Sequence, residues 1–91
     1  MKAAVHMCPV CGFRGLKEPS YDQQDVPSYE ICSCCGFEFG CDEKQDMVRF
    51  REAWIGKGAA WFTPDAKPVD WKLQQQLNDL DREATKKRLS P

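Results

Sequence analysis

Polar and apolar positions divide the chain into two unlike halves. Up to about residue 41, short apolar segments are separated by prolines and glycines, so no run is long enough for a helix. Residues 28–31 and 36–39 place aromatic or β-branched side chains at alternate positions, which predicts two short, half-buried strands. Residues 19–27 (PSYDQQDVP) are polar and are expected to form a loop. The first half is therefore predicted to consist of turns, short strands and one loop.

A first helix is predicted where the second half begins. Its apolar side chains repeat at helical spacing and would form one stripe, made of Met47, Phe50 and Trp54 and widened by Val48 and Ile55. Asp42, followed three residues later by Gln45, fits the capping-box pattern for the start of this helix. Gly56 and Gly58 are expected to end it.

A second helix is predicted near the C-terminus. Asp70 can cap it, and the narrow apolar face consists of Leu73, Leu77, Leu80 and Ala84. A basic run at its end, Lys86, Lys87 and Arg88, suits the negative end of the helix dipole. Between the helices, residues 59–62 are apolar and are expected to form a turn or strand over the core. A loop is expected after them, marked by Thr63-Pro64 and Lys67-Pro68.

Two similar cysteine turns, CPVCGF (residues 8–13) and CSCCGF (residues 32–37), are the strongest chemical signal. Aligning them on the trailing Gly-Phe pairs Cys8 with Cys32 and Cys11 with Cys35. The resulting spacing, C-x2-C-x20-C-x2-C, lies at the upper edge of the range for four-cysteine zinc sites. We therefore predict that Cys8, Cys11, Cys32 and Cys35 bind a metal ion.

The spacing has a physical reason. Two residues between ligands form a tight turn that presents both sulfurs to one ion, and the next residue must often adopt positive φ, which glycine does readily. Zn²⁺ is the first choice because four thiolates around a d¹⁰ ion make a closed structural site, and iron is the alternative. A closed site leaves no open position for activating water, which argues against hydrolysis there.

Length and composition also favour a small domain stabilised by a bound metal ion. Ninety-one residues make one small domain whose core alone is marginal, so additional fastening is expected. Within it we expect a flexible N-terminus over 1–7, where His-Met resembles a cloning junction, a four-cysteine zinc ribbon over 8–41, and a helical half over 42–91 packed on the ribbon. The chain shows no signal peptide and no membrane span, so the reducing cytoplasm is the expected compartment, where paired cysteines favour metal over disulfides.

The net charge of −1 conceals a strong asymmetry. Residues 18–46 carry eight acidic side chains against Lys44 alone, a net of −7, whereas both flanking segments are basic. An acidic surface repels phosphate, so nucleic acid is an unlikely partner for this segment and a basic protein surface is a suitable one.

The remaining candidate residues have plain structural interpretations beside functional ones. Cys34 is expected to face away from the ion as a small packing residue, with replacement ligand, redox sensor or intermolecular disulfide as alternatives. Cys41 precedes the first helix, whose dipole could lower its pKa, but a structural role is favoured. His6 is expected to be a terminal residue rather than a ligand. The tryptophans are expected in the core, except that Trp71 either closes over the other half or is exposed for a partner.

The run CPVCGFRGL…PSYEICSCCGFEFG, followed by REAW…WF…KPVDWKLQQQL, resembles the small bacterial cysteine-rich domains named for a CPCC-type motif. The resemblance covers most of residues 8–80 and departs in the CSCC turn and in Cys41. It implies a zinc-ribbon fold and a bound metal. Short proteins of this kind are often encoded near secreted toxins, which implies an immunity function by analogy. The CGFEF segment is also similar to rubredoxin, which is shorter and lacks the helical half.

Three functions follow as expectations. The first is a non-enzymatic, zinc-stabilised protein-interaction module of small α+β fold, plausibly an immunity or antitoxin-type inhibitor whose acidic surface covers a toxin or nuclease. The second is a rubredoxin-like electron carrier with iron in the same four sulfurs. The third is a nucleic-acid-binding zinc ribbon, favoured only by basic positions such as Arg49 and Arg51.

Overall fold

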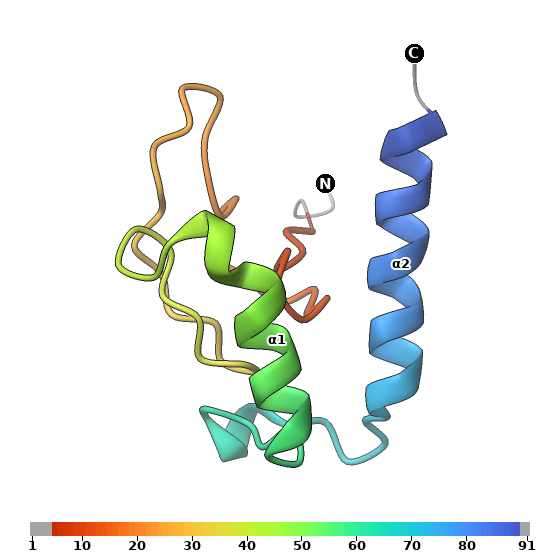
Figure 1. The fold of residues 1–91 in the computed structure, drawn as a ribbon. Helices are drawn as coiled ribbons and strands as arrows, with labels where there is room; N and C mark the ends of the chain where they lie inside the picture. The colour runs from red at the N-terminus through yellow and green to blue at the C-terminus, as the bar shows by residue number, and fades with distance from the viewer. Residues whose placement is uncertain (1–4, 90–91) are drawn as a thin grey trace.

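The computed structural model of the protein describes residues 5–89, with side chains up to residue 83. The helical elements are the 3-10 turn η1 (Lys44–Asp46), the helix α1 (Met47–Gly56), the 3-10 turn η2 (Pro64–Ala66) and the long helix α2 (Leu73–Leu89). The chain up to residue 43 forms turns and loops on one side, and its first cysteine turn lies between α1 and α2 (Figure 1). The result is a small domain in which two helices enclose a cysteine-rich centre.

The two short strands expected over 28–31 and 36–39 do not form. Between residues 5 and 89 the backbone pairs only through isolated bridges, among them Ile31 with Glu38 and Phe39 with Asp42. The physical reason is that the turn from Cys32 to Phe37 bends the chain back on itself so tightly that only single residue pairs come opposite each other. The expectation of a β-stranded zinc ribbon is therefore unconfirmed, while a compact domain with two helices is observed.

The first helix starts later than the capping box predicts. The α-helix begins at Met47 after the 3-10 turn, and neither Glu43 nor Asp46 provides a side-chain cap. Asp42 instead accepts a hydrogen bond from the Glu38 backbone N–H at 2.9 Å, and Gln45 contacts Glu43. The Asp42 carboxylate is thus used to close the preceding turn, so it cannot also cap the helix.

The end of α1 and its buried face agree with the expected pattern in part. Gly58 has φ +100°, and the Ala59 N–H donates to the Trp54 carbonyl at 2.8 Å, which terminates the helix as predicted. Trp54 is buried and Met47 and Phe50 pack partly against the core, but Val48 and Ile55 are exposed. The apolar stripe is therefore narrower than the sequence suggests.

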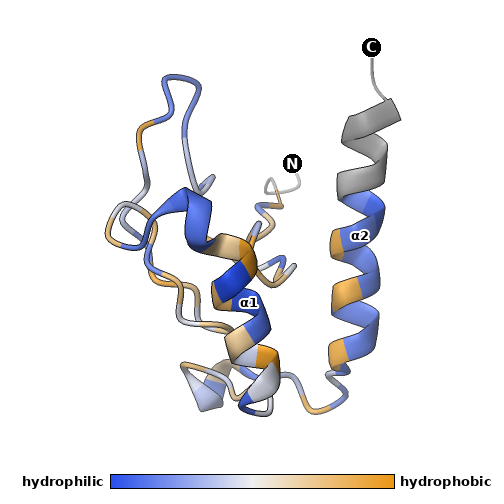
Figure 2. Cartoon of the chain, viewed as in Figure 1, coloured by the Kyte–Doolittle hydropathy of each residue, from blue (hydrophilic) through white to orange (hydrophobic). Residues whose placement is uncertain are grey.

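The second helix also begins later than expected. Asp70 lies in a turn closed by the Trp71 N–H and the Pro68 carbonyl, three residues before Leu73, so it does not cap the helix. The apolar side of α2 faces the rest of the molecule (Figure 2). The side chains of Ala84, Lys86, Lys87 and Arg88 lie outside the described part of the structure. No described helix is long and apolar enough to cross a lipid bilayer.

The core is built around sulfur and aromatic rings rather than aliphatic side chains. The fully buried side chains are Phe37, Phe39 and Val10 together with Cys8, Cys11, Cys32 and Cys34. Trp54 and Trp61 close this cluster from the helical half, each 7% exposed. Because the cysteines occupy the centre of the domain, an interaction that links their sulfurs also stabilises the fold.

Candidate metal centre

The two cysteine turns have the same backbone geometry. In the first, the Cys8 N–H donates to the Phe13 carbonyl at 2.7 Å and the Gly12 N–H donates to the Cys8 carbonyl at 2.9 Å. In the second, Cys32 and Phe37 make the first of these bonds at 3.0 Å, and Gly36 and Cys32 make the other at 2.9 Å. Gly12 and Gly36 have φ values of +88° and +85°. The positive φ predicted from the trailing glycines is thus confirmed at both positions.

The turns bring four sulfurs to one point. The Sγ atoms of Cys8, Cys11, Cys32 and Cys35 all lie within 4.8 Å of one another, and all four residues are buried. The Cys8–Cys35 and Cys11–Cys32 sulfur pairs are 3.9 and 3.8 Å apart, and all six cysteines are free thiols. A tetrahedral Zn²⁺ site with Zn–S bonds of about 2.3 Å separates its sulfurs by about 3.8 Å. The cluster therefore fits a four-coordinate metal ion, as the spacing predicts.

The electrostatics of this cluster favour a bound cation. The hydrogen bond from the Cys11 side chain lowers the pKa of the Cys32 thiol, and the same contact raises the pKa of Cys11. The contact with Cys11 lowers the pKa of Cys35, but contacts with Cys32 and Cys8 and burial raise it more, so its net shift is upward. Without a cation these pKa shifts favour the thiolate of Cys32 and the protonated thiols of Cys11 and Cys35. Four thiolates together require a positive ion among them.

The helical half holds the first turn in place through two long side chains. Arg51 on α1 donates to the Val10 carbonyl at 3.2 Å, and Gln76 on α2 donates through Nε2 to the Cys11 carbonyl at 3.0 Å. Helix α2 also touches the turn directly, because a Cβ on Gly12 would lie 2.8 Å from the Gln76 carbonyl oxygen. The first cysteine turn is therefore fixed by both helices.

The segment between the helices holds the second turn. The Phe62 N–H donates to the Cys34 carbonyl at 3.0 Å, and the Thr63 N–H donates to the Ser33 carbonyl at 2.8 Å. The Phe62 ring covers Gly36, where an added Cβ would meet the ring at 2.9 Å. The apolar segment over 59–62 thus lies on the core as expected, without forming a strand.

Gln76 is a site residue that the sequence does not reveal. It is 8% exposed, and besides binding the Cys11 carbonyl its Nε2 lies 3.4 Å from the Cys34 sulfur. Its Oε1 accepts a hydrogen bond from the Trp71 indole at 2.8 Å. Its position could have indicated burial, because it lies three residues after Leu73 and four before Leu80, on the apolar side of α2. However, it is one of three consecutive glutamines, and the sequence does not show which of them is buried.

The other candidate residues have clear positions. Cys34 is fully buried, outside the four-sulfur group, and contacts Gln76, whereas Cys41 is exposed. The His6 carbonyl accepts a hydrogen bond from the Leu16 N–H at 3.3 Å, and its side chain is not part of the sulfur cluster. Trp71 is partly buried against the core and packs edge-on against Trp61 of the same half, with ring centroids 5.5 Å apart. Among the described side chains, the buried Trp61 Nε1 has no hydrogen-bond partner.

Two proteins of Bacillus subtilis (strain 168) are similar to this chain. The uncharacterised protein YoaQ is 42% identical, over 79% of this chain and 75% of YoaQ. The chain belongs to the YoaQ family. The uncharacterised protein YozI is 27% identical over 72% of this chain and 69% of its own length. No family model and no solved structure match the chain. The YoaQ name states no activity, so the sulfur cluster is the chemical feature on which a function can be argued.

Proposed function

We propose that this chain is a zinc-stapled, non-enzymatic binding module that recognises the basic surface of another protein. The observation that carries the proposal is a closed cluster of four buried sulfurs beside a loop region rich in exposed acidic side chains. The cluster supports a structural ion, and the loop region supports recognition by charge.

The closed cluster supports a stabilising rather than a catalytic metal. Its four sulfur ligands fill a tetrahedral shell, and exposures of 0% for Cys8, Cys11 and Cys32 and 7% for Cys35 leave no path for substrate. A catalytic zinc would keep one position for water, with three protein ligands. The geometry therefore supports a structural metal ion that links the two cysteine turns.

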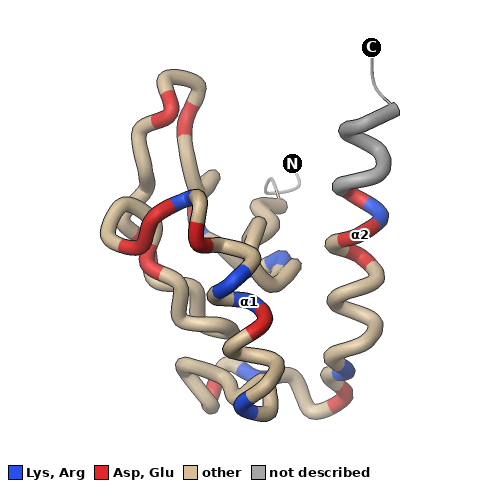
Figure 3. Tube along the Cα trace, viewed as in Figure 1, with Lys and Arg blue, Asp and Glu red and all other residues tan. Residues whose placement is uncertain are grey.

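Acidic positions occur along the loops before α1 and on η1, and α2 carries acidic positions as well (Figure 3). Three of them hold their own loops: Asp22 accepts from the Val26 N–H at 2.8 Å, Glu30 accepts from the Lys17 N–H at 3.0 Å, and Asp42 closes the Glu38 turn. Glu18 and Glu43 are exposed; the Glu18 carboxylate has no partner among the described contacts, and the Glu43 carboxylate contacts only the Gln45 side chain. These two carboxylates are the best candidates for contacts with a partner.

The class of partner that we propose rests on the resemblance to CPCC-type domains. A toxin or nuclease whose phosphate-binding cleft is basic presents the charge that an acidic inhibitor would cover. We therefore propose an immunity or antitoxin-type role, in which the metal keeps the acidic loops in one conformation.

Paired charge reversals test this function. The zinc-loaded wild-type chain, immobilised, is compared with the double variant Glu18→Lys, Glu43→Lys, and with a matched control, Glu52→Lys, Asp81→Lys, which changes two exposed acids of the helical half. We expect a basic protein to be retained by the wild type and the control, and its affinity for the loop variant to fall about tenfold or more. Equal retention by all three proteins would contradict the proposal.

Iron in the same four sulfurs is the second candidate, because a tetrahedral thiolate site suits iron as well as zinc. Such a protein would be red and would carry electrons. One zinc per chain in a colourless preparation excludes this candidate. Tight, salt-dependent binding of DNA or RNA at physiological salt would favour the nucleic-acid alternative instead.

A further inference from the structure

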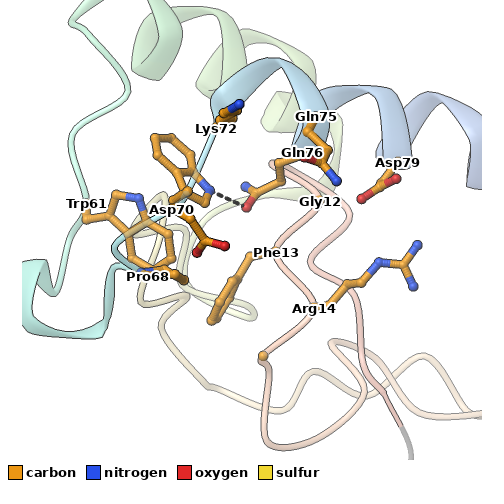
Figure 4. A pocket seen from close by; sticks show the side chains of 12 residues that line it. Gly12, Phe13, Arg14, Trp61, Pro68, Asp70, Lys72, Gln75, Gln76 and Asp79 are labelled. Atoms are coloured by element: carbon orange, nitrogen blue, oxygen red, sulfur yellow. Dashed lines mark hydrogen bonds between the residues drawn. The ribbon is translucent and has the colours of Figure 1, made fainter.

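A cavity of about 450 Å³ opens between the first cysteine turn, the segment before α2 and the first turns of α2. Its walls include three aromatic side chains, Phe13, Trp61 and Trp71, together with Pro68 and Asp70 (Figure 4). None of these residues belongs to the four-sulfur cluster. The cavity is therefore separate from the candidate metal centre, although Gln76 borders both.

The three rings pack on one another, nearly at right angles, along one side of the cavity. The Phe13 and Trp61 centroids are 5.3 Å apart with an interplanar angle of 81°, and Trp61 and Trp71 are 5.5 Å apart at 85°. Trp61 is 93% buried, and the hydrogen bond from the Trp71 indole to Gln76 fixes the orientation of the second tryptophan. In each pair the edge of one ring lies against the face of the other, so the three rings form a continuous aromatic wall of the cavity.

Two acidic and two basic residues line the cavity, so the direction in which each side chain points decides which charge a bound group meets. The Asp70 carboxylate points into the space between the Trp61 and Phe13 rings, whereas the side chains of Arg14 and Lys72 point away from it (Figure 4). The Lys67 ammonium already lies 5.4 Å from the Trp71 ring centroid. This contact is an example within the molecule of a cation attracted by one of the same rings.

We propose that this cavity binds an organic cation, an ammonium or guanidinium group. The rings supply cation–π attraction and Asp70 supplies the opposite charge. The group could be a free small cation or the end of a lysine or arginine side chain of a partner. This proposal does not depend on the partner being a toxin or on the acidic loops, which lie elsewhere on the molecule.

Charged probes and their neutral isosteres test the proposal. The zinc-loaded chain is titrated with choline and with 3,3-dimethyl-1-butanol, which has the same shape without the charge, and binding is followed by the NMR shifts of the tryptophan indole N–H groups. N-acetyl-arginine methyl ester and the citrulline equivalent form a second pair. We expect at least one charged probe to bind about 5- to 30-fold more tightly than its neutral isostere. Equal binding within both pairs, or no binding by any probe, would overturn the proposal.

Two variants locate the site. Asp70→Asn and Phe13→Leu should each weaken binding of the charged probe about fivefold or more, whereas Asp65→Asn and Phe62→Leu, at exposed positions outside the cavity, should leave it unchanged. Indole shifts in the absence of probe report whether each variant keeps its fold. If the cavity variants fold and bind as the wild type does, the assignment is wrong. A basic peptide that binds at least tenfold more tightly than the arginine ester indicates a protein source for the cation, and equal affinity indicates a small molecule.

Discussion

At the scale of single residues, Gln76 is the side chain that connects the helical half to the sulfur cluster. Replacing it with methionine keeps the length and apolar body but removes the partners of the Cys11 carbonyl and the Trp71 indole. Because an unpaired buried polar group costs about 1–3 kcal/mol, we expect Gln76→Met to lower the free energy of unfolding by about 2–4 kcal/mol. Urea unfolding of the zinc-loaded protein measures this change.

Gln75→Met is the matched control, because Gln75 is exposed and makes no described hydrogen bond to the cysteine turns. Its effect should stay within about 0.5 kcal/mol. Equal losses in the two variants would mean that helix propensity or surface polarity, rather than the hydrogen bonds of Gln76, explains the result.

The glycines that follow the cysteine turns should differ in their tolerance of alanine. Both Gly12→Ala and Gly36→Ala force a side chain into positive φ, at a cost of about 1–2 kcal/mol. At Gly36 the new Cβ meets the exposed Phe62 ring, which can move, but at Gly12 it meets the Gln76 backbone oxygen at 2.8 Å. We therefore expect Gly12→Ala to destabilise the protein more than Gly36→Ala in thermal unfolding.

Gly56→Ala provides the comparison, because Gly56 lies at the end of α1 without positive φ and with open space around its Cα. It should be neutral or slightly stabilising. The reverse order of the two cysteine-turn variants would show that the contact between α2 and the first turn is looser than observed.

The cluster of four cysteines could be predicted from sequence because its signal is local. The Cys-x2-Cys spacing and the trailing Gly-Phe are repeated, and both turns adopt the same hydrogen bonds. Gln76 could not be predicted in this way, because its partner Cys11 is 65 positions away and nothing in three adjacent glutamines distinguishes the buried one. The identity of the ion also stays a prediction, since four thiolates fit more than one metal.

At the scale of elements, apolar spacing located both helices, but the expected cap residues placed their starts too early. Asp42 and Asp70 each fit a cap by sequence, yet each belongs to the turn before the helix. The strands failed for a related reason: alternation over four residues describes side chains that point alternately inward and outward, which a tight turn around a sulfur cluster achieves without a sheet. Over residues 36–39, the buried Phe37 and Phe39 alternate with the partly exposed Gly36 and Glu38, although no strand forms.

Helix α1 gives a prediction at this scale, because Trp54 is its buried side chain. Trp54 is 7% exposed and its Nε1 donates to the Ala60 carbonyl at 2.8 Å, which ties the helix to the segment that covers the second cysteine turn. We expect Trp54→Ala to lower the unfolding free energy by about 3–5 kcal/mol, measured by urea denaturation. Ile55→Ala, at the adjacent and exposed position, should cost less than about 1 kcal/mol. Similar losses would mean that α1 is not held by its tryptophan.

At the scale of the whole molecule, contacts between the two halves surround the four-sulfur cluster. The cysteine turns are held by Arg51, Gln76 and the backbone of residues 62 and 63, so neither half is complete without the other. A structural zinc is worth about 10–16 kcal/mol at neutral pH, which matches or exceeds the stability of a typical small domain. We expect chelation at pH 7 to unfold both halves together, observed as simultaneous loss of helical circular dichroism and of tryptophan burial. Unchanged spectra after verified metal removal would contradict a structural metal.

The same centre should make metal affinity depend steeply on pH. Because metal removal is expected to unfold the protein, the cysteines of the metal-free state have their ordinary pKa of about 8.5 and are protonated at pH 7. The metal binds thiolates, so these protons must leave on binding, and lowering the pH favours the protonated, metal-free form. We expect at least two protons to be released per zinc at pH 7, measured by titration calorimetry in buffers of different ionisation enthalpy. Apparent affinity should then fall by about 100-fold or more for each pH unit lost, because each released proton contributes about tenfold per unit. Release of fewer than two protons would mean that fewer sulfurs bind the ion than the four that the fold brings together.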